Sequence, residues 1–193
     1  MSYRAIVIGG SAGSFPVVTK ILSQLRPGFR VPIILCLHRL KHVREGFSEA
    51  LGYKSVLPVI EPSDKQKIKP GHVYLAPSNY HLMVEHVGNA FALSTDEMVK
   101  FSRPSIDVLF QSAAYTYREK VVGILLSGAN TDGVAGIACL KKRGGYTLVQ
   151  DPAECTIRTM TEGAIKATEI DEVLTTEGII KYLNQLSNVH VVG

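Results

Sequence analysis

The sequence predicts an α/β fold of the doubly wound type, with a mainly parallel central sheet and helices on both of its faces. Three observations predict it. Short, almost continuous apolar runs recur along the chain, as is typical of strands that are buried on both faces. Segments with apolar residues at helical spacing separate these runs. Strands that alternate with helices are usually joined by crossovers, which makes neighbouring strands parallel.

The N-terminal half begins with a strand, a helix and a second strand. An apolar β-branched run over residues 5–8 stops at Gly9-Gly10. Apolar residues then recur at helical spacing over 17–25, before Arg26-Pro27-Gly28 ends the helix. The second strand is expected over 31–37, where nearly every residue is apolar. Shorter elements follow: a helix at 47–51, strands at 73–76 and 82–84, and a strand at 90–93 that a turn at Gly88-Asn89 makes into a β-hairpin insertion.

The C-terminal half continues the alternation of strands and helices. The predicted elements are a helix over 106–117, a buried strand over 121–126, a helix over about 133–143, a strand over 146–150, a weak helix over 161–167, a strand over 172–174 and a closing helix over 177–186. The sequence contains no internal repeat and no low-complexity linker. We therefore expect residues 1–193 to form a single domain.

Composition argues against several other classes of protein. With 46% hydrophobic and 20% charged residues, the 193-residue chain has the composition of a globular protein with one substantial core. The formal net charge of +4 comes from scattered basic residues, whereas nucleic-acid binding usually needs them clustered. No apolar run approaches the length of about 20 residues that spans a bilayer. We expect neither nucleic-acid binding nor membrane insertion.

The cysteines and the start of the sequence indicate a reducing compartment. Cys36, Cys139 and Cys155 are an odd number without the spacing of a disulfide framework. Met-Ser-Tyr-Arg leads directly into the first apolar run, without a basic segment or a small-residue cleavage site. The expected location is therefore cytoplasmic.

Three polar residues follow predicted strands, where an open α/β sheet gathers its functional side chains. Ser11 lies in Gly9-Gly10-Ser11-Ala12-Gly13, directly after the first strand. His38 follows the second strand, and Asp132 lies in the segment 127–133 after a later one. The loops beyond the carboxyl ends of parallel strands converge at one edge of the sheet. The three side chains are therefore candidates for one site.

The chemistry of these residues fits a serine hydrolase. The first segment matches G-x-S-x-G, a sharp turn that exposes a serine hydroxyl beside free helix amides suited to an oxyanion. A serine hydroxyl is a weak nucleophile, so it needs a base such as the imidazole of His38. Asp132 can fix the imidazole tautomer and stabilise its protonated form. The chain order Ser, His, Asp differs from the Ser, Asp, His order of the α/β-hydrolases, which argues against that particular fold.

Spacing alone leaves other interpretations open. A glycine-rich turn after a first strand commonly binds a phosphate or a dinucleotide, although Ser11 replaces the second glycine of G-x-G-x-x-G and no P-loop is present. A histidine after an apolar run commonly has a structural role, and Asp132-Gly133 is also typical of a helix cap or a turn. His72, His81 and His86 lack the ligand spacing of a known zinc site, so no metal is expected.

Six segments of the chain carry a family resemblance. They are IVIGGSAGS from Ile6, LCLH ending at His38, GHVYLAPSNYH at 71–81, FSRPSIDVLFQSAA at 101–114, VVGILLSGANTDGVAG at 121–136 and GGYTLVQD at 144–151. In this order they resemble the catalytic domain of the chemotaxis protein-glutamate methylesterases (CheB), from about Ile6 to Leu183. The RPSIDVLF and LLSGANTDG segments are the most specific.

The resemblance implies both a reaction and a set of residues. The reaction is hydrolysis of glutamyl methyl esters on cytoplasmic helices of chemoreceptors, often with deamidation of selected glutamines. The family's serine, histidine and aspartate fall on Ser11, His38 and Asp132. The backbone amides of Ala12 and Ala129 are the expected oxyanion donors, and neither a metal nor an organic cofactor is needed.

The chain departs from the family pattern around the expected site. Ala12 stands where a threonine is usual, Ser14 where a glycine is usual, and Ala129-Asn130 where a methionine is common. We also expect no N-terminal receiver domain. These departures keep two alternatives open: a catalytically weak signalling module that retains the fold as a binding surface, and an esterase for another, smaller substrate.

Overall fold

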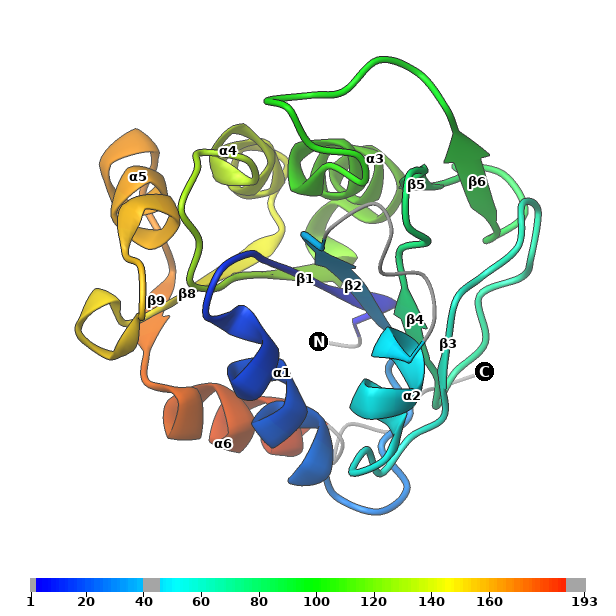
Figure 1. Ribbon diagram of the computed structural model, residues 1–193, viewed down its shortest axis with the longest axis horizontal. Helices are drawn as coiled ribbons and strands as arrows, with labels where there is room; N and C mark the ends of the chain where they lie inside the picture. The colour runs from blue at the N-terminus through cyan, green and yellow to red at the C-terminus, as the bar shows by residue number, and fades with distance from the viewer. Residues whose placement is uncertain (1–2, 40–45, 187–193) are drawn as a thin grey trace.

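The computed structural model describes residues 3–39 and 46–186, and within them a parallel sheet forms the centre of the molecule (Figure 1). Its seven strands lie in the order β3-β4-β2-β1-β7-β8-β9, and every neighbouring pair is parallel. The bounds are Ala5–Gly10 for β1, Ile33–Leu37 for β2, Val59–Ile60 for β3, Val73–Leu75 for β4, Val121–Leu125 for β7, Tyr146–Gln150 for β8 and Glu172–Leu174 for β9.

Helices cover both faces of this sheet, as the sequence predicts (Figure 1). One face carries α1 (Ser14–Ser23), α2 (Phe47–Gly52) and α6 (Thr176–Leu186), and the other carries α3 (Ile106–Tyr117), α4 (Val134–Lys142) and α5 (Thr159–Ala167). Two short 3₁₀ helices, Arg118–Lys120 and Pro152–Glu154, follow α3 and β8. None of the described helices combines the length and the apolar character needed to cross a membrane.

Each face of the sheet has its own apolar core, because successive side chains of a strand point to opposite faces. In β1, Ala5 and Val7 belong to the core beneath α3 and α4, whereas Ile6 and Ile8 belong to the core beneath α1 and α6. All four residues are fully buried. This burial on both sides explains why the strand sequences are continuously apolar rather than alternating.

The predicted hairpin is an antiparallel pair outside the main sheet. Strand β5 (His81–Val84) pairs with β6 (Phe91–Ser94), so that His81 lies opposite Ser94. The pair is joined to α3: the amide of Val84 donates to Ser112 Oγ at 3.1 Å, and Thr116 Oγ1 donates to the carbonyl of Val84 at 3.2 Å. The hairpin thereby extends the apolar core beneath α3.

One boundary and one strand show how the structure departs from the sequence prediction for physical reasons. Strand β1 continues through Gly9 and Gly10, where a turn was expected, because both residues still pair with β2. A Cβ on Gly9 would lie 2.3 Å from Ile106 Cγ2, so the absence of a side chain allows α3 to pack closely. The two-residue strand β3 was not predicted, since so short an edge strand has no periodicity.

Candidate active site

Three adjacent strands place the three candidate residues at the same edge of the sheet. His38 follows β2, Ser11 follows the central strand β1, and Asp132 lies on the loop after β7. The backbone amide of His38 donates to the carbonyl of Gly10 at 3.0 Å, and that of Ser11 donates to the carbonyl of Ser127 at 2.9 Å. These backbone hydrogen bonds continue the pairing of the strands beyond their ends and hold the three loops side by side.

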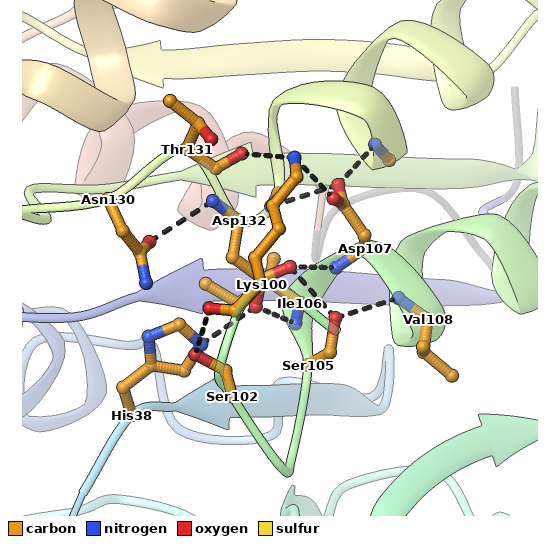
Figure 2. Close-up of polar contacts among 12 residues, drawn as sticks. His38, Lys100, Ser102, Ser105, Ile106, Asp107, Val108, Asn130, Thr131 and Asp132 are labelled. Carbon is orange, nitrogen blue, oxygen red and sulfur yellow. Dashed lines mark hydrogen bonds and ion pairs between the residues drawn. The ribbon is translucent and has the colours of Figure 1, made fainter. Parts of the chain in front are cut away.

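His38 and Asp132 form a direct hydrogen bond. His38 Nε2 lies 2.8 Å from Asp132 Oδ2, as Figure 2 shows. The carboxylate is fully buried, whereas 13% of the histidine side chain is exposed. Because Nε2 is committed to the carboxylate, Nδ1 is the ring nitrogen that remains to exchange a proton with another group.

The buried carboxylate of Asp132 is satisfied by the start of α3. Oδ2 accepts the amide of Ile106 at 2.7 Å, and Oδ1 accepts Ser105 Oγ at 2.8 Å and the amide of Asp107 at 3.0 Å (Figure 2). Burial raises the pKa of Asp132, but the hydrogen bonds from His38, from the two amides and from Ser105 outweigh it and leave the pKa below 3.8, its ordinary value. Asp132 is therefore an anion at neutral pH.

Asp107, in the first turn of α3, makes the corresponding contacts with α4. Its Oδ1 accepts the amides of Gly133 at 2.9 Å and Gly136 at 2.6 Å. Its Oδ2 lies 2.8 Å from Lys100 Nζ, which also donates to the carbonyl of Thr131 at 2.7 Å (Figure 2). Each carboxylate thus satisfies amides at a helix N-terminus, where negative charge is favourable.

The turn that carries Ser11 is braced by its own helix. Ser14, buried at the start of α1, donates from both its amide (3.0 Å) and its Oγ (2.7 Å) to the carbonyl of Ser11. A Cβ on Gly10 would lie 2.5 Å from Ser14 Cβ, so the serine at position 14 fits because position 10 is glycine. Ser14, a departure from the family pattern, therefore stabilises the turn.

Ser127 ties the loop of Ser11 to the loops after β7 and β8. Its Oγ lies 2.8 Å from the carbonyl oxygen of Ala12 and 3.0 Å from that of Ile157, which share its single proton, and it accepts the amide of Ile157 at 3.1 Å. Beside it, Gly128 packs so closely that a Cβ would lie 3.0 Å from Ser11 Cβ and 2.4 Å from Met160 Cε. The position of Ser11 is therefore set by long-range contacts as well as by its own turn.

Ser11 and His38 line one open pocket. Within the described residues, Ser11 Oγ makes no hydrogen bond with His38, so the two side chains share the pocket without being joined. Ala12 lies exposed at the same pocket, and Ala129 is exposed on the loop after β7. The volume is about 400 Å³, and the lining residues are Ser11, Ala12, His38, Arg39, Phe101, Ser102, Arg103 and Pro104.

The remaining candidate ligands and nucleophiles have structural surroundings. His81 is buried, with Nε2 2.9 Å from the carbonyl of Glu97 and Nδ1 accepting the amide of Ser105 at 3.2 Å. Among residues 3–39 and 46–186, no group of three or more histidine, cysteine or acidic side chains is arranged to hold a metal ion. Burial, followed by the negative charges of Asp132 and Asp107, raises the pKa of the Cys36 thiol, so this cysteine is a poor nucleophile.

Sequence reasoning missed the residues that support the site. Ser105, Asp107, Lys100 and Ser127 hold or brace the loops of Asp132 and Ser11, across sequence separations that no local pattern reveals. Ser105 could have been found, because a serine directly before a predicted helix is typical of an N-cap, and its Oγ does accept the amide of Val108.

Comparison with known proteins agrees with this architecture. The family model described as CheB methylesterase matches residues 6–183. A Leptospira interrogans protein, provisionally named protein-glutamate methylesterase/protein-glutamine glutaminase, is 41% identical over 186 residues, which cover 96% of both chains. A Saccharophagus degradans protein named protein-glutamate methylesterase/protein-glutamine glutaminase 1 is 35% identical over 171 residues, which cover 89% of this chain and 47% of the relative.

A solved structure extends the likeness to three dimensions. The crystal structure of the Thermotoga maritima CheB methylesterase catalytic domain aligns with a TM-score of 0.90 at 29% sequence identity, covering 96% of this chain and all of that one. This chain therefore combines the sequence pattern of the family with a matching fold, which includes the parallel sheet, the hairpin and the helices on both faces. The chain belongs to the CheB methylesterase family.

Proposed function

We propose that this protein is a serine hydrolase that removes methyl groups from glutamyl methyl esters of chemoreceptor-type proteins. In this proposal Ser11 is the nucleophile, His38 is the general base and Asp132 orients His38. The observation that carries it is the 2.8 Å bond between His38 and a buried carboxylate, at a pocket that Ser11 also lines. The names of the relatives supply the substrate class.

The reaction divides into acylation and deacylation. Ser11 Oγ attacks the ester carbonyl carbon while its proton passes to Nδ1 of His38, and a tetrahedral oxyanion forms. The C–O bond to the methoxy group then breaks, and the leaving oxygen takes the proton from His38 to give methanol. Water attacks the acyl-enzyme with His38 again as base, which releases the glutamate carboxylate and restores Ser11.

Asp132 contributes in two ways to this proposed mechanism. As a buried anion it stabilises the imidazolium that forms when His38 holds the proton. As a hydrogen-bond acceptor it holds Nε2 protonated, which leaves a lone pair on Nδ1 for the serine proton. Its own bonds to the start of α3 prevent it from rotating away.

The proposed oxyanion donors are the backbone amides of Ala12 and Ala129. Within the described part of the chain neither amide has a hydrogen-bond acceptor, and both residues are exposed at the edge where the loops meet. Amides near the start of α1 also lie at the positive end of its dipole. Two free donors aimed at a developing alkoxide are the usual arrangement in acyl transfer.

The wider setting follows from the same proposal. We assign residues 1–193 to one catalytic domain, which the single layered arrangement of the described residues supports. The proposed partners are methylated cytoplasmic helices of a chemoreceptor-like protein, and the proposed location is the cytoplasm. Glutamine deamidation would use the same acyl-enzyme, with ammonia in place of methanol as the leaving group.

Methanol release from a methylated chemoreceptor fragment tests the proposal. We expect the wild-type protein to release methanol and Ser11→Ala and His38→Gln to lose this activity. Ser102→Ala is the matched control, because Ser102 lines the same pocket outside the triad. Equal release by wild type and Ser11→Ala would contradict the mechanism. Turnover of small esters alone would favour another substrate, and no turnover at all would favour a silent binding module.

A further inference from the structure

Phe101 is an exposed aromatic residue beside the candidate nucleophile. Its side chain is 97% exposed, yet it lines the pocket of Ser11 and His38. Single exposed apolar residues are common on protein surfaces, so exposure alone indicates nothing about function. The backbone and the surroundings of this residue distinguish it from an ordinary surface phenylalanine.

The backbone at Phe101 has an unfavourable conformation. Val99 and Ser102 pair in an isolated antiparallel bridge, with amide-to-carbonyl distances of 3.2 and 2.9 Å. The two residues between them, Lys100 and Phe101, have φ angles of 48° and 62°. Such a two-residue turn favours asparagine, aspartate or glycine, because the left-handed conformation is unfavourable for other residues. Because 97% of the Phe101 side chain is exposed, its packing does little to offset that cost.

Charged side chains on either side of Phe101 hold this turn in place. Lys100 Nζ binds Asp107 and the carbonyl of Thr131, so the turn is fixed to the same framework that holds Asp132 (Figure 2). On the other side, Arg103 donates to Asn79 Oδ1 at 2.9 and 3.2 Å, and to the carbonyls of residues 95 and 96 at 2.6 and 2.8 Å. The turn is thus anchored to two separate parts of the fold.

An exposed aromatic residue on an anchored turn is well suited to binding. Ordering a binding residue in advance lowers the entropy that association costs, and exposed aromatic residues commonly become centres of binding energy once a partner covers them. Unfavourable backbone conformations also tend to occur at functional sites. At Phe101 these features coincide within the candidate active-site pocket.

The position of Phe101 indicates what covers it. If the proposed function holds, a glutamyl ester enters the pocket while the backbone that carries it remains outside. The residues that flank the ester then pass the mouth of the pocket, where Phe101 lies exposed. We propose that Phe101 is a substrate-docking residue that packs against an apolar side chain flanking the ester-bearing glutamate, and so favours polypeptides with an apolar flank.

Two matched peptides test this specificity. Each carries one central glutamyl γ-methyl ester, flanked by leucines in the first peptide and by serines in the second. We expect the wild-type protein to prefer the leucine peptide in kcat/KM by about tenfold, mainly through KM, because truncating a buried aromatic contact commonly costs at least that much binding. Phe101→Ala should reduce the preference to near unity, and Phe101→Leu should retain most of it.

The controls separate docking from folding and from catalysis. Tyr53→Ala removes an aromatic residue that is 87% exposed and not among the residues lining the pocket, and it should leave the preference unchanged. On the small ester N-acetylglutamate γ-methyl ester, which has no flanking residues, Phe101→Ala should lose much less activity than on the leucine peptide. An unchanged leucine-to-serine ratio in Phe101→Ala, or an equal loss on both peptides and the small ester, would overturn the proposal.

A binding measurement distinguishes this inference from the proposed reaction. Fluorescence anisotropy gives the Kd of each labelled peptide for Ser11→Ala and for Ser11→Ala/Phe101→Ala. If the wild-type protein hydrolyses neither peptide, the esterase proposal fails, but tighter binding of the leucine peptide that depends on Phe101 would still support docking. Equal affinities in the two variants would contradict docking whatever the activity.

Discussion

Asp132 and Asp107 cross-link the starts of α3 and α4, because each carboxylate accepts backbone amides at the start of the other residue's helix. Asp132, on the loop before α4, binds the amides of Ile106 and Asp107 at the start of α3. Asp107, in the first turn of α3, binds the amides of Gly133 and Gly136 at the start of α4. Neither carboxylate can move without leaving buried donors unsatisfied, so the orientation of Asp132 towards His38 is fixed before any substrate binds.

Asp132→Asn should nearly abolish hydrolysis. An amide nitrogen facing His38 would donate to Nε2 and leave the proton on Nδ1, where it blocks acceptance of the serine proton. By analogy with serine proteases, we expect kcat to fall on the order of 10³- to 10⁴-fold. Methanol release under single-turnover conditions measures it. A fall of less than tenfold would show that Asp132 does not orient the base.

The same substitution should reveal a pH-dependent stability term. Burial raises the pKa of Asp132, but its hydrogen bonds hold it below the ordinary value of 3.8. A lowered pKa stabilises the fold fully above that ordinary value, and the contribution is lost as the pH falls through the folded-state pKa. Urea unfolding at several pH values should therefore show wild type more stable than Asp132→Asn near neutral pH, with a gap that narrows below about pH 4. A constant gap would contradict the assignment.

Gly128→Ala should impair activity more than stability. The new Cβ would lie 3.0 Å from Ser11 Cβ, and the Met160 side chain can move aside more easily than the braced turn of Ser11 can. We expect kcat to fall more than about tenfold, since small displacements of a nucleophile are costly. Gly52→Ala is the control, because its Cβ would meet only Val59 at 3.8 Å. Unchanged kcat in Gly128→Ala would show that Ser11 tolerates displacement.

Lys100→Met should separate substrate binding from catalysis. Lys100 is 36% exposed, and without it the buried carboxylate of Asp107 still accepts the amides of Gly133 and Gly136. Losing the contacts to Asp107 and Thr131 frees the turn that carries Phe101. We expect KM for the leucine-flanked peptide to rise several-fold with kcat within about twofold of wild type, because ordering a loose loop reduces affinity. A large fall in kcat with unchanged KM would instead indicate that Lys100 acts through Asp132.

Much of the fold could be predicted because the strands and the helices differ clearly in the spacing of their apolar residues. The strands β1, β2 and β7 are continuous apolar runs, and α3 was predicted with its observed bounds of Ile106–Tyr117. The order of strands in the sheet was not predicted, since it depends on contacts between distant segments. Edge elements such as β3 were missed because two residues cannot show a period.

The site could be predicted only in part. The rule that function lies beyond the carboxyl ends of parallel strands identified Ser11, His38 and Asp132, and the structure places all three at one edge. The network around Asp132 could not be inferred, because Asp107 lies on another loop-helix junction and reads locally as an ordinary residue of a first helical turn. The catalytic roles of Ser11, His38 and Asp132 remain predictions for the assays above.

The first strand of the chain occupies the middle of the sheet, between β2 and β7. During translation, one edge of β1 therefore stays unpaired until Leu125, the last residue of β7, has been added. The loop that carries Asp132 is synthesised later still. An unpaired central edge invites association with other strands. Incomplete chains therefore expose the edge of a central strand, and they lack the loop that brings Asp132 to His38.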